Sequence, residues 1–150
     1  MKTAADGTEH RRLAPWWVGP VFGIGALSLI PWMAYLGVTL PSTERISERT
    51  AWIGFDVGLM IMLGLTAILA HRHSIRLAQA SMATATMLVV DAWFDIFTSG
   101  GGSALAQALQ LAVVEVGLAG VCVWISLHAG TVAGRAMIAT ATEPPAASNP

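Results

Sequence analysis

The sequence predicts an all-α integral membrane protein, an up-down bundle of four transmembrane helices. Of its 150 residues, 55% are hydrophobic and 11% are charged, and the mean hydropathy is +0.63, more than the core of a soluble domain of this length requires. Four apolar runs are each long enough to cross a hydrocarbon core, which takes about 20 helical residues. The connections between them are short, so consecutive helices must run antiparallel.

The predicted spans cover residues 16–40, 51–70, 77–98 and 104–128, separated by PSTERISERT, HRHSIR and TSGGGS. The first run has tryptophans at both ends and no small-residue cleavage pattern, which indicates a retained span and not a secretory signal. We divide the chain into a polar N-terminal arm (1–13), a four-helix transmembrane domain (14–128) and a C-terminal tail (129–150). Small residues and prolines predict that the tail is flexible.

The distribution of positive charge predicts the orientation in the membrane, because cytoplasmic loops carry an excess of Lys and Arg. Arg45 and Arg49 lie in the first connection, on one side of the predicted bundle. The other side carries Lys2, Arg11, Arg12, Arg72, Arg76 and Arg135. We therefore expect a multi-pass protein of the cytoplasmic membrane with both termini in the cytoplasm. Trp16, Trp17, Trp52 and Trp124 lie near the predicted interfaces and are interpreted as interfacial anchors.

Four acidic residues lie within the apolar runs, where no Lys or Arg is found: Asp56, Asp91, Asp95 and Glu115. An aspartate at the bilayer centre costs on the order of 2.5 to 3.5 kcal/mol on insertion scales, and less towards the interface. With a rise of about 1.5 Å per residue, Glu115 falls near the midplane and the three aspartates lie about 4 to 10 Å further out. Something other than a basic side chain must therefore compensate these groups.

Helical periodicity predicts that the acids face the interior of the bundle. In the third span a polar stripe comprises Ser81, Thr84, Leu88, Asp91, Asp95 and Thr98, opposite Met82, Val89, Trp93 and Ile96. In the fourth span Glu115 shares a face with small residues that permit close helix packing, namely Ala104, Ala108, Ala112, Ala119, Cys122 and Ser126. The acids of the two spans should therefore meet.

The first and second spans are expected to complete an acidic pocket that is open towards the outside. Asp56 lies in the second span. Trp32 and Tyr35 share a face of the first span with Ser28 and with Pro31, a residue that can kink a helix. Carboxyl groups this close together in a medium of low dielectric should share protons or a bound cation. The alternative is that they only form hydrogen bonds between helices.

Two glycine pairs are candidates for a homodimer contact. Gly54 and Gly58 have the spacing of a close-packing motif, and so do Gly19 and Gly23. Helical rotation places the first pair roughly 200° from Asp56, which predicts that it faces outward if Asp56 faces inward.

Other signals are interpreted as structural. The lone Cys122 excludes an internal disulfide. We interpret His71, His73 and His128 as interfacial anchors and not as a metal site, because their spacing is poor and no carboxylate lies nearby. No metal ligand set and no cofactor are assigned, and no nucleic-acid-binding surface is found.

Three stretches resemble a family of short four-helix membrane proteins from actinobacteria. They are LIPWMAYLGVTLP in the first span, AWIGFDVGL in the second and TMLVVDAWFDIFTS in the third. The resemblance covers roughly residues 13 to 128, and its AW-GFD and DAWFD elements carry it. It implies the four-span architecture and nothing about chemistry.

We favour the hypothesis that Asp56, Asp91, Asp95 and Glu115 bind protons, a metal cation or a cationic small molecule, with transport as one use. Trp32 and Tyr35 would form walls that offer cation-π contact or a phenolic hydrogen bond. One alternative is a membrane-embedded enzyme that uses carboxyl groups as acid and base on a lipid or isoprenoid. Another is a non-catalytic membrane subunit. Catalysis calls for a lateral opening to lipid, whereas transport calls for an aqueous path to the cytoplasm.

Overall fold

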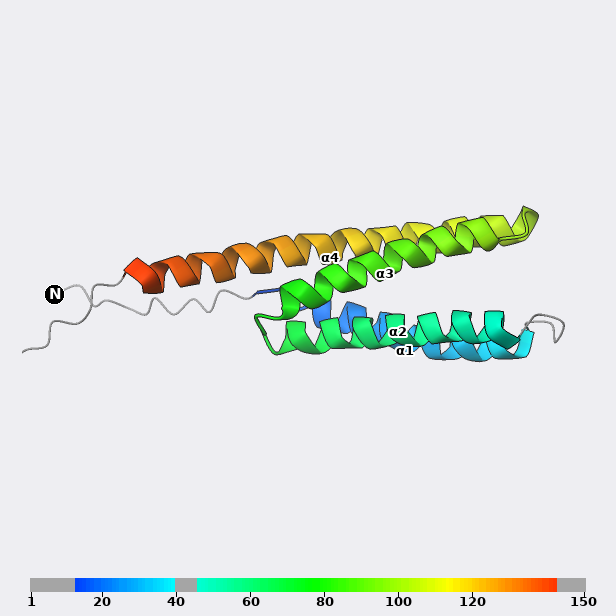
Figure 1. Cartoon of the computed structure of the whole chain (residues 1–150), viewed down its shortest axis with the longest axis horizontal. Coiled ribbons are helices and arrows are strands. Elements are labelled where there is room, and N and C mark those ends of the chain that lie inside the picture. Colours follow the sequence, from blue (N-terminus) through cyan, green and yellow to red (C-terminus); the bar gives the residue numbers. More distant parts are fainter. Residues whose placement is uncertain (1–12, 40–45, 143–150) are drawn as a thin grey trace, which may run out of the picture.

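The computed structural model consists of four consecutive α-helices (Figure 1). They are α1 (Val18–Thr39), α2 (Ile46–His71), α3 (Leu77–Thr98) and α4 (Gly102–Thr142). The structure describes residues 13–39 and 46–142, except for the side chains of residues 36, 39, 46–49, 133 and 135–142. Within these ranges there is no strand, and the predicted all-α four-helix architecture is confirmed.

Each helix contains a stretch that is long and apolar enough to cross a membrane. These stretches are Val18–Tyr35, Thr50–His71, Leu77–Thr98 and Gly102–Val132. Most of their side chains face outward: only 17% of the first stretch and 39% of the third are buried inside the protein. An apolar exterior of this kind suits a hydrocarbon surrounding, so the chain is a multi-pass membrane protein.

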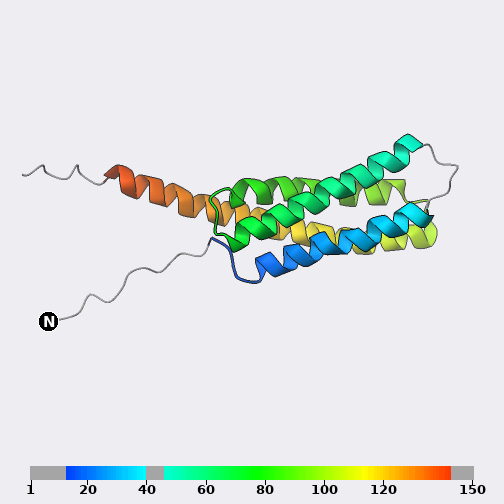
Figure 2. The same ribbon diagram turned by 90° about the horizontal axis from the view of Figure 1, so that it is seen from below.

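The helices form two pairs (Figures 1 and 2). α1 packs on α2, and α3 packs most extensively on α4. The pairs are joined through packing of α2 on α3, whereas α1 and α4 do not approach each other closely in the described residues. Figure 2 shows α1 and α2 lying over the other pair. The bundle is therefore closed on one side, between α2 and α3.

Local backbone geometry explains the two described turns. After α2, the backbone amide of Ser74 donates to the carbonyl of Leu69 at 3.0 Å, and His73 has a φ of 49°, a left-handed conformation that can end a helix. Between α3 and α4, Gly101 and Gly102 have φ angles of 87° and 58°. Glycine adopts these angles without steric cost, which explains the glycine run in this connection.

α4 is longer than its predicted span. The sequence predicts an end near residue 128 and a flexible tail from residue 129, but the helix continues to Thr142 and extends beyond the other three (Figure 1). The added segment is rich in alanine and contains no proline before Pro144, so nothing in it interrupts the helix. The polar arm up to residue 12 and residues 143–150 lie outside the described residues.

The innermost part of the bundle holds apolar side chains together with three buried hydroxyl groups. Phe22, Leu59, Leu77 and Ile125 are among the largest fully buried residues. The hydroxyl oxygens of Thr66 and Thr84 lie 2.9 Å apart, so they join α2 to α3. The Thr84 hydroxyl also lies 2.9 Å from the carbonyl oxygen of Ala80, one turn earlier in its own helix. Ser81 is fully buried as well.

The two glycine pairs that were considered for a dimer contact lie partly inside the protein. A Cβ atom at Gly58 would lie 3.3 Å from the terminal methyl carbon of Met87 in α3, and one at Gly19 would lie 3.6 Å from the carbonyl oxygen of Ala67 in α2. Gly54 and Gly23 face open space. One glycine of each pair is therefore used for packing within the chain.

Candidate functional site

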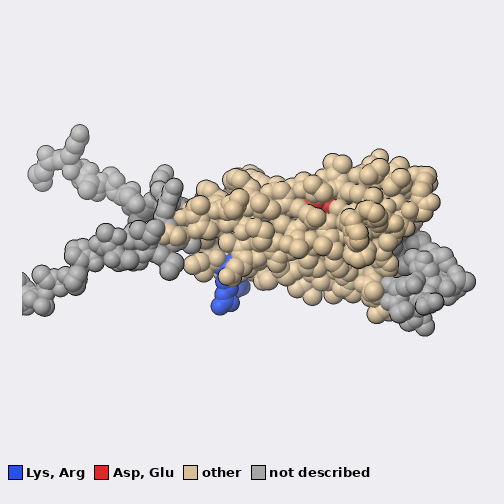
Figure 3. Space-filling view, turned by 45° about the horizontal axis from the view of Figure 1, so that its top comes forward, with Lys and Arg blue, Asp and Glu red and all other residues tan. Residues whose placement is uncertain are grey.

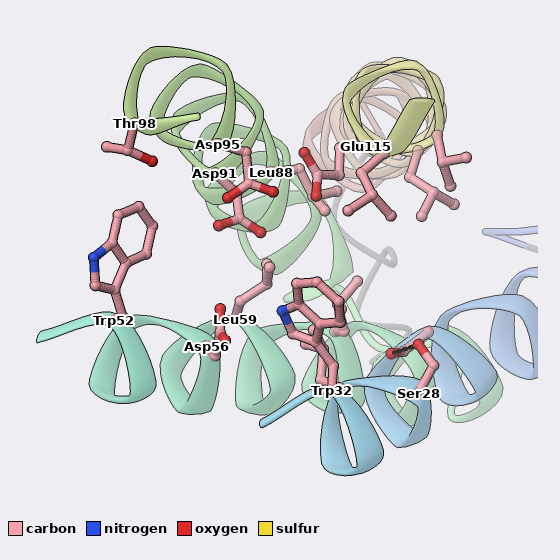
Figure 4. Close-up of a pocket in the computed structure, with 16 residues that line it drawn as sticks. Ser28, Trp32, Trp52, Asp56, Leu59, Leu88, Asp91, Asp95, Thr98 and Glu115 are labelled. Atoms are coloured by element: carbon pink, nitrogen blue, oxygen red, sulfur yellow. Dashed lines mark hydrogen bonds between the residues drawn. The ribbon is translucent and has the colours of Figure 1, made fainter. Parts of the chain in front are cut away.

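A cavity of about 540 Å³ lies between the two helix pairs (Figure 4). It is located towards the end of the bundle that carries the α3–α4 turn. All four helices contribute to its walls, and most of the lining side chains are apolar. The lining residues are Gly25, Ser28, Leu29, Trp32, Trp52, Asp56, Leu59, Leu63, Leu88, Asp91, Asp95, Thr98, Leu111, Val114, Glu115 and Leu118.

The four intramembrane acids all line this cavity. Asp91 and Asp95 project from successive turns of α3, and Glu115 points towards them from α4 (Figure 4). Asp56 lies on the opposite wall and points up from α2. The spacing of four residues within α3 and the close packing of α3 on α4 explain why three of the acids share one wall.

Two of these acidic residues are almost completely buried and have no partner among the described residues. Asp56 is 4% exposed and Asp91 is 6% exposed. Among the described residues, no hydrogen bond or ion pair is formed with the carboxyl oxygens of either residue. The Oε2 atom of Glu115 is also buried and lacks a hydrogen-bond partner. Buried polar groups are normally satisfied, and in the described residues Oε2 of Glu115 shares the lack of a partner only with the buried hydroxyl of Ser81. The carboxyl oxygens of Asp56 and Asp91 keep some exposure at the cavity, where a ligand can reach them.

No described basic side chain lies at the cavity. Arg72 and Arg76 are the only Lys or Arg residues whose side chains the structure describes, and both follow α2 at the other end of the bundle. Figure 3 shows the acidic atoms as a small patch in an uncharged surface, with the described basic side chains well away from it. Arg45 lies outside the described residues, as does the side chain of Arg49.

The two aromatic residues predicted as walls differ in position. Trp32 lines the cavity and projects from α1 between Asp56 and Glu115 (Figure 4). Tyr35 is not a lining residue; it is 58% exposed and its ring stacks on Trp32, with centroids 5.8 Å apart. Tyr35 therefore supports the indole ring from behind and does not form part of the wall.

Trp52 is a lining residue that the sequence interpretation assigned to the membrane interface. It borders the cavity next to Asp56 and packs edge-on against Phe94, with centroids 5.7 Å apart. Its spacing from Asp56 could have predicted this position: Trp52 precedes Asp56 by four residues and therefore lies on the same face of α2. The same rule applies to Leu111 and Leu118, which flank Glu115 on α4.

The carboxyl groups surround the cavity and do not form a compact ligand set. Among the described residues, no group of three or more His, Cys, Asp or Glu side chains is arranged to hold a metal ion. His128, considered above as an interfacial anchor, stacks on Trp124 with centroids 5.5 Å apart. The arrangement suits a cation large enough to contact more than one wall.

Comparison of the chain with protein-family models, with curated proteins and with solved structures gives no match. The function is therefore inferred from the geometry of the cavity.

Proposed function

We propose that this membrane protein binds a cationic organic molecule in the cavity between its two helix pairs. The observation that carries the proposal is the pair of buried carboxyl groups, Asp56 and Asp91, which face the cavity without a partner from the described residues. An unpaired carboxylate in an apolar surrounding is costly, and a bound cation would offset that cost.

The size and lining of the cavity favour an organic cation over a metal ion. Small-molecule sites typically measure about 300 to 1,000 Å³ and combine apolar walls with a few polar groups. The present cavity measures about 540 Å³ and has leucine, valine and tryptophan walls around the acids. The rings of Trp32 and Trp52 add surfaces suited to cation-π contact. Asp56 and Asp91, the two almost fully buried acids, would be the deep binding groups, with the partly exposed Asp95 and Glu115 nearer the mouth.

The orientation that accompanies this proposal has the cavity facing outward. The excess of Lys and Arg lies on the side of the termini and of the 72–76 turn, which the positive-inside rule assigns to the cytoplasm. The cavity lies towards the opposite end, so its ligand would come from the outer side of the membrane.

The proposal is tested by ligand-dependent thermal unfolding of the purified protein in dodecyl maltoside micelles. Choline is the probe, and its uncharged carbon analogue 3,3-dimethylbutan-1-ol is the control for non-specific effects. Choline at about 100 times its Kd should stabilise the wild type by about 2.7 kcal/mol and raise Tm. Asp91→Asn and Glu115→Gln should remain folded and lose this shift.

Thr86→Val is the matched control on α3, because Thr86 is exposed and lies outside the cavity lining. It should keep the full choline shift. An unchanged wild-type Tm across choline, other cations and a range of pH would contradict the proposal, and so would an equal shift with the uncharged analogue.

A second candidate is acid–base catalysis on a lipid, with one carboxyl group as acid and another as base. The observation that favours it is the unequal exposure of Asp91, which is almost fully buried, and Glu115, which is partly exposed. The floor of the cavity consists of Leu59, Leu63 and Leu88, which are at most 3% exposed. Such a closed floor favours a binding or catalytic site over an aqueous transport path through the protein. Formation of a new lipid product that Asp91→Asn abolishes would distinguish this candidate from simple binding.

A further inference from the structure

The cavity lacks a packed wall between α1 and α4. Both helices contribute lining residues, such as Leu29 and Trp32 from α1 and Leu111 and Val114 from α4. Yet the backbones of α1 and α4 do not come close to each other in the described part of the chain, whereas those of α2 and α3 do. Phe22 of α1 and Ile125 of α4 still belong to one buried core, so the separation matters at the cavity and not along the whole length of the two helices. The cavity is therefore bounded by helix packing on one side and open on the other.

The exposure of the lining residues identifies where the opening lies. Val114 is 60% exposed, Leu111 is 39% exposed and Trp32 is 38% exposed, although all three line the cavity. A side chain that both lines a cavity and faces the exterior belongs to its rim. The rim between α1 and α4 consists of these three side chains and the exposed Ser28 of α1, so it is mainly apolar, in contrast to the buried leucine floor. Thr98 of α3 is also exposed and lines the cavity beside the α3–α4 turn.

This rim lies at the depth of the membrane. Trp32 belongs to the candidate span Val18–Tyr35, and Leu111 and Val114 belong to the candidate span Gly102–Val132. The opening therefore faces hydrocarbon chains and not bulk water. A fully hydrated ion cannot easily use such an opening, but a molecule with an apolar chain can.

We propose that the ligand is an amphipathic cation, a positively charged head group on a hydrocarbon chain, and that it enters sideways from the membrane between α1 and α4. The head group contacts Asp56, Asp91 and Glu115, while the chain passes over the apolar rim into the surrounding lipid. Two features of the cavity support this class of ligand. The acids complement the positive charge of the head group, and the apolar side chains of the rim suit the hydrocarbon chain. The inference rests on the proposed cation-binding function and specifies its ligand.

The test compares octyltrimethylammonium with choline on the wild-type protein in dodecyl maltoside micelles, with empty micelles subtracted. Octan-1-ol, which has the same chain without the charge, is the control ligand. We expect octyltrimethylammonium to bind at least about tenfold more tightly than choline, because its chain concentrates it in the apolar phase that the rim faces. Octan-1-ol should not compete.

Val114→Trp narrows the rim, and Leu111→Trp is a second rim variant in case the first unfolds. The matched control is Val113→Trp, since Val113 is 74% exposed on the same helix but does not line the cavity. The rim variants should weaken octyltrimethylammonium binding about tenfold and change choline binding less than about twofold. Val113→Trp should change neither.

The outcomes separate this inference from the proposed function. If the wild type binds neither cation, the cation-binding function itself fails. If it binds choline but octyltrimethylammonium binds no more tightly, or if rim and control variants behave alike, cation binding stands and sideways access from the membrane is wrong.

Discussion

Along the polar face of α3, neighbouring side chains have different surroundings. Thr84 is fully buried, and its hydroxyl meets Thr66 of α2 and the carbonyl of Ala80. Asp91, two turns further along, faces a cavity and has no such partner among the described residues. Thr84 therefore joins α3 to α2, although the buried hydroxyl of Ser81, one turn deeper, has no hydrogen-bond partner among the described residues. The part of the face near the α3–α4 turn is available to a ligand.

Replacing Thr84 with valine tests the structural part of this face. Thr84→Val keeps the shape of the side chain and removes the hydroxyl that bridges to Thr66. We expect a loss of about 1 kcal/mol in the free energy of unfolding, because hydrogen bonds between membrane helices contribute about 0.6 to 1.7 kcal/mol. The measurement is equilibrium unfolding in mixed micelles.

Thr86→Val is the matched control for this substitution. The Thr86 hydroxyl lies 3.1 Å from the carbonyl oxygen of Met82 in the same helix and contributes nothing between helices. Its removal should leave the free energy of unfolding within about 0.5 kcal/mol of the wild type. Equal effects of the two substitutions would show that the Thr66–Thr84 contact has no stabilising role.

The sequence could predict which residues share the polar face of α3, but not what each of them contacts. Helical periodicity places Ser81, Thr84 and Asp91 on one side, and the structure buries all three. Whether a hydroxyl or carboxyl group finds a partner depends on the alignment of α2 against α3. A single sequence does not specify that alignment, so the division between structural and ligand-facing groups emerged only from the structure.

At the scale of helices, Gly58 lies where α2 packs closely on α3, with room for no more than a small side chain. A Cβ atom there would come within 3.3 Å of the flexible end of Met87, so alanine requires only a small shift. The notch of Gly54 and Gly58 was predicted to face away from the bundle because it lies opposite Asp56. That prediction assumed that α2 has a single face directed into the bundle. Because α2 packs on both α1 and α3, it has two such faces, and Gly58 lies on the one that meets α3.

Gly58→Leu should therefore separate α2 from α3 and destabilise the protein by about 1 to 3 kcal/mol, as overpacking usually does. The matched control is Gly54→Leu, because a side chain at Gly54 meets nothing within 4 Å. Both substitutions raise helix propensity equally, so their difference isolates the packing effect. Thermal unfolding of the two variants measures it, and a Gly58→Leu variant as stable as Gly54→Leu would contradict the packing role.

At the scale of the whole molecule, the orientation across the membrane can be measured with single cysteines. Gly100→Cys lies in the α3–α4 turn, and Ile75→Cys lies in the turn after α2; both positions are exposed. An outward-facing cavity predicts that a membrane-impermeant maleimide labels Gly100→Cys on intact cells. It should label Ile75→Cys only after the membrane is permeabilised.

The native Cys122 provides an internal control for this experiment, because it is fully buried and should not react in either condition. Labelling of Ile75→Cys on intact cells, with Gly100→Cys protected, would reverse the orientation. The cavity would then face the cytoplasm.

Loop lengths and hydropathy were sufficient to predict four antiparallel spans, because short connections leave no other topology. They did not predict that α1 and α4 stay apart, since amphipathic periodicity identifies an inward face without specifying the neighbour it meets. The gap between these two helices depends on side-chain volumes across all four, with Trp32 occupying part of the space between the pairs. The sequence could thus predict that the four acids share one cavity, but not that Trp52 lines it in place of Tyr35, nor the shape of the opening.

The organisation into two pairs also has a consequence for how the protein is made. The chain crosses from the α1–α2 pair to the α3–α4 pair once, through residues 72–76. We expect each pair to leave the translocation machinery as a finished hairpin, with Asp56 in the first and the remaining three acids in the second. The acids then come together only when the hairpins dock, so neither half of the newly synthesised chain carries the complete acidic cluster through insertion.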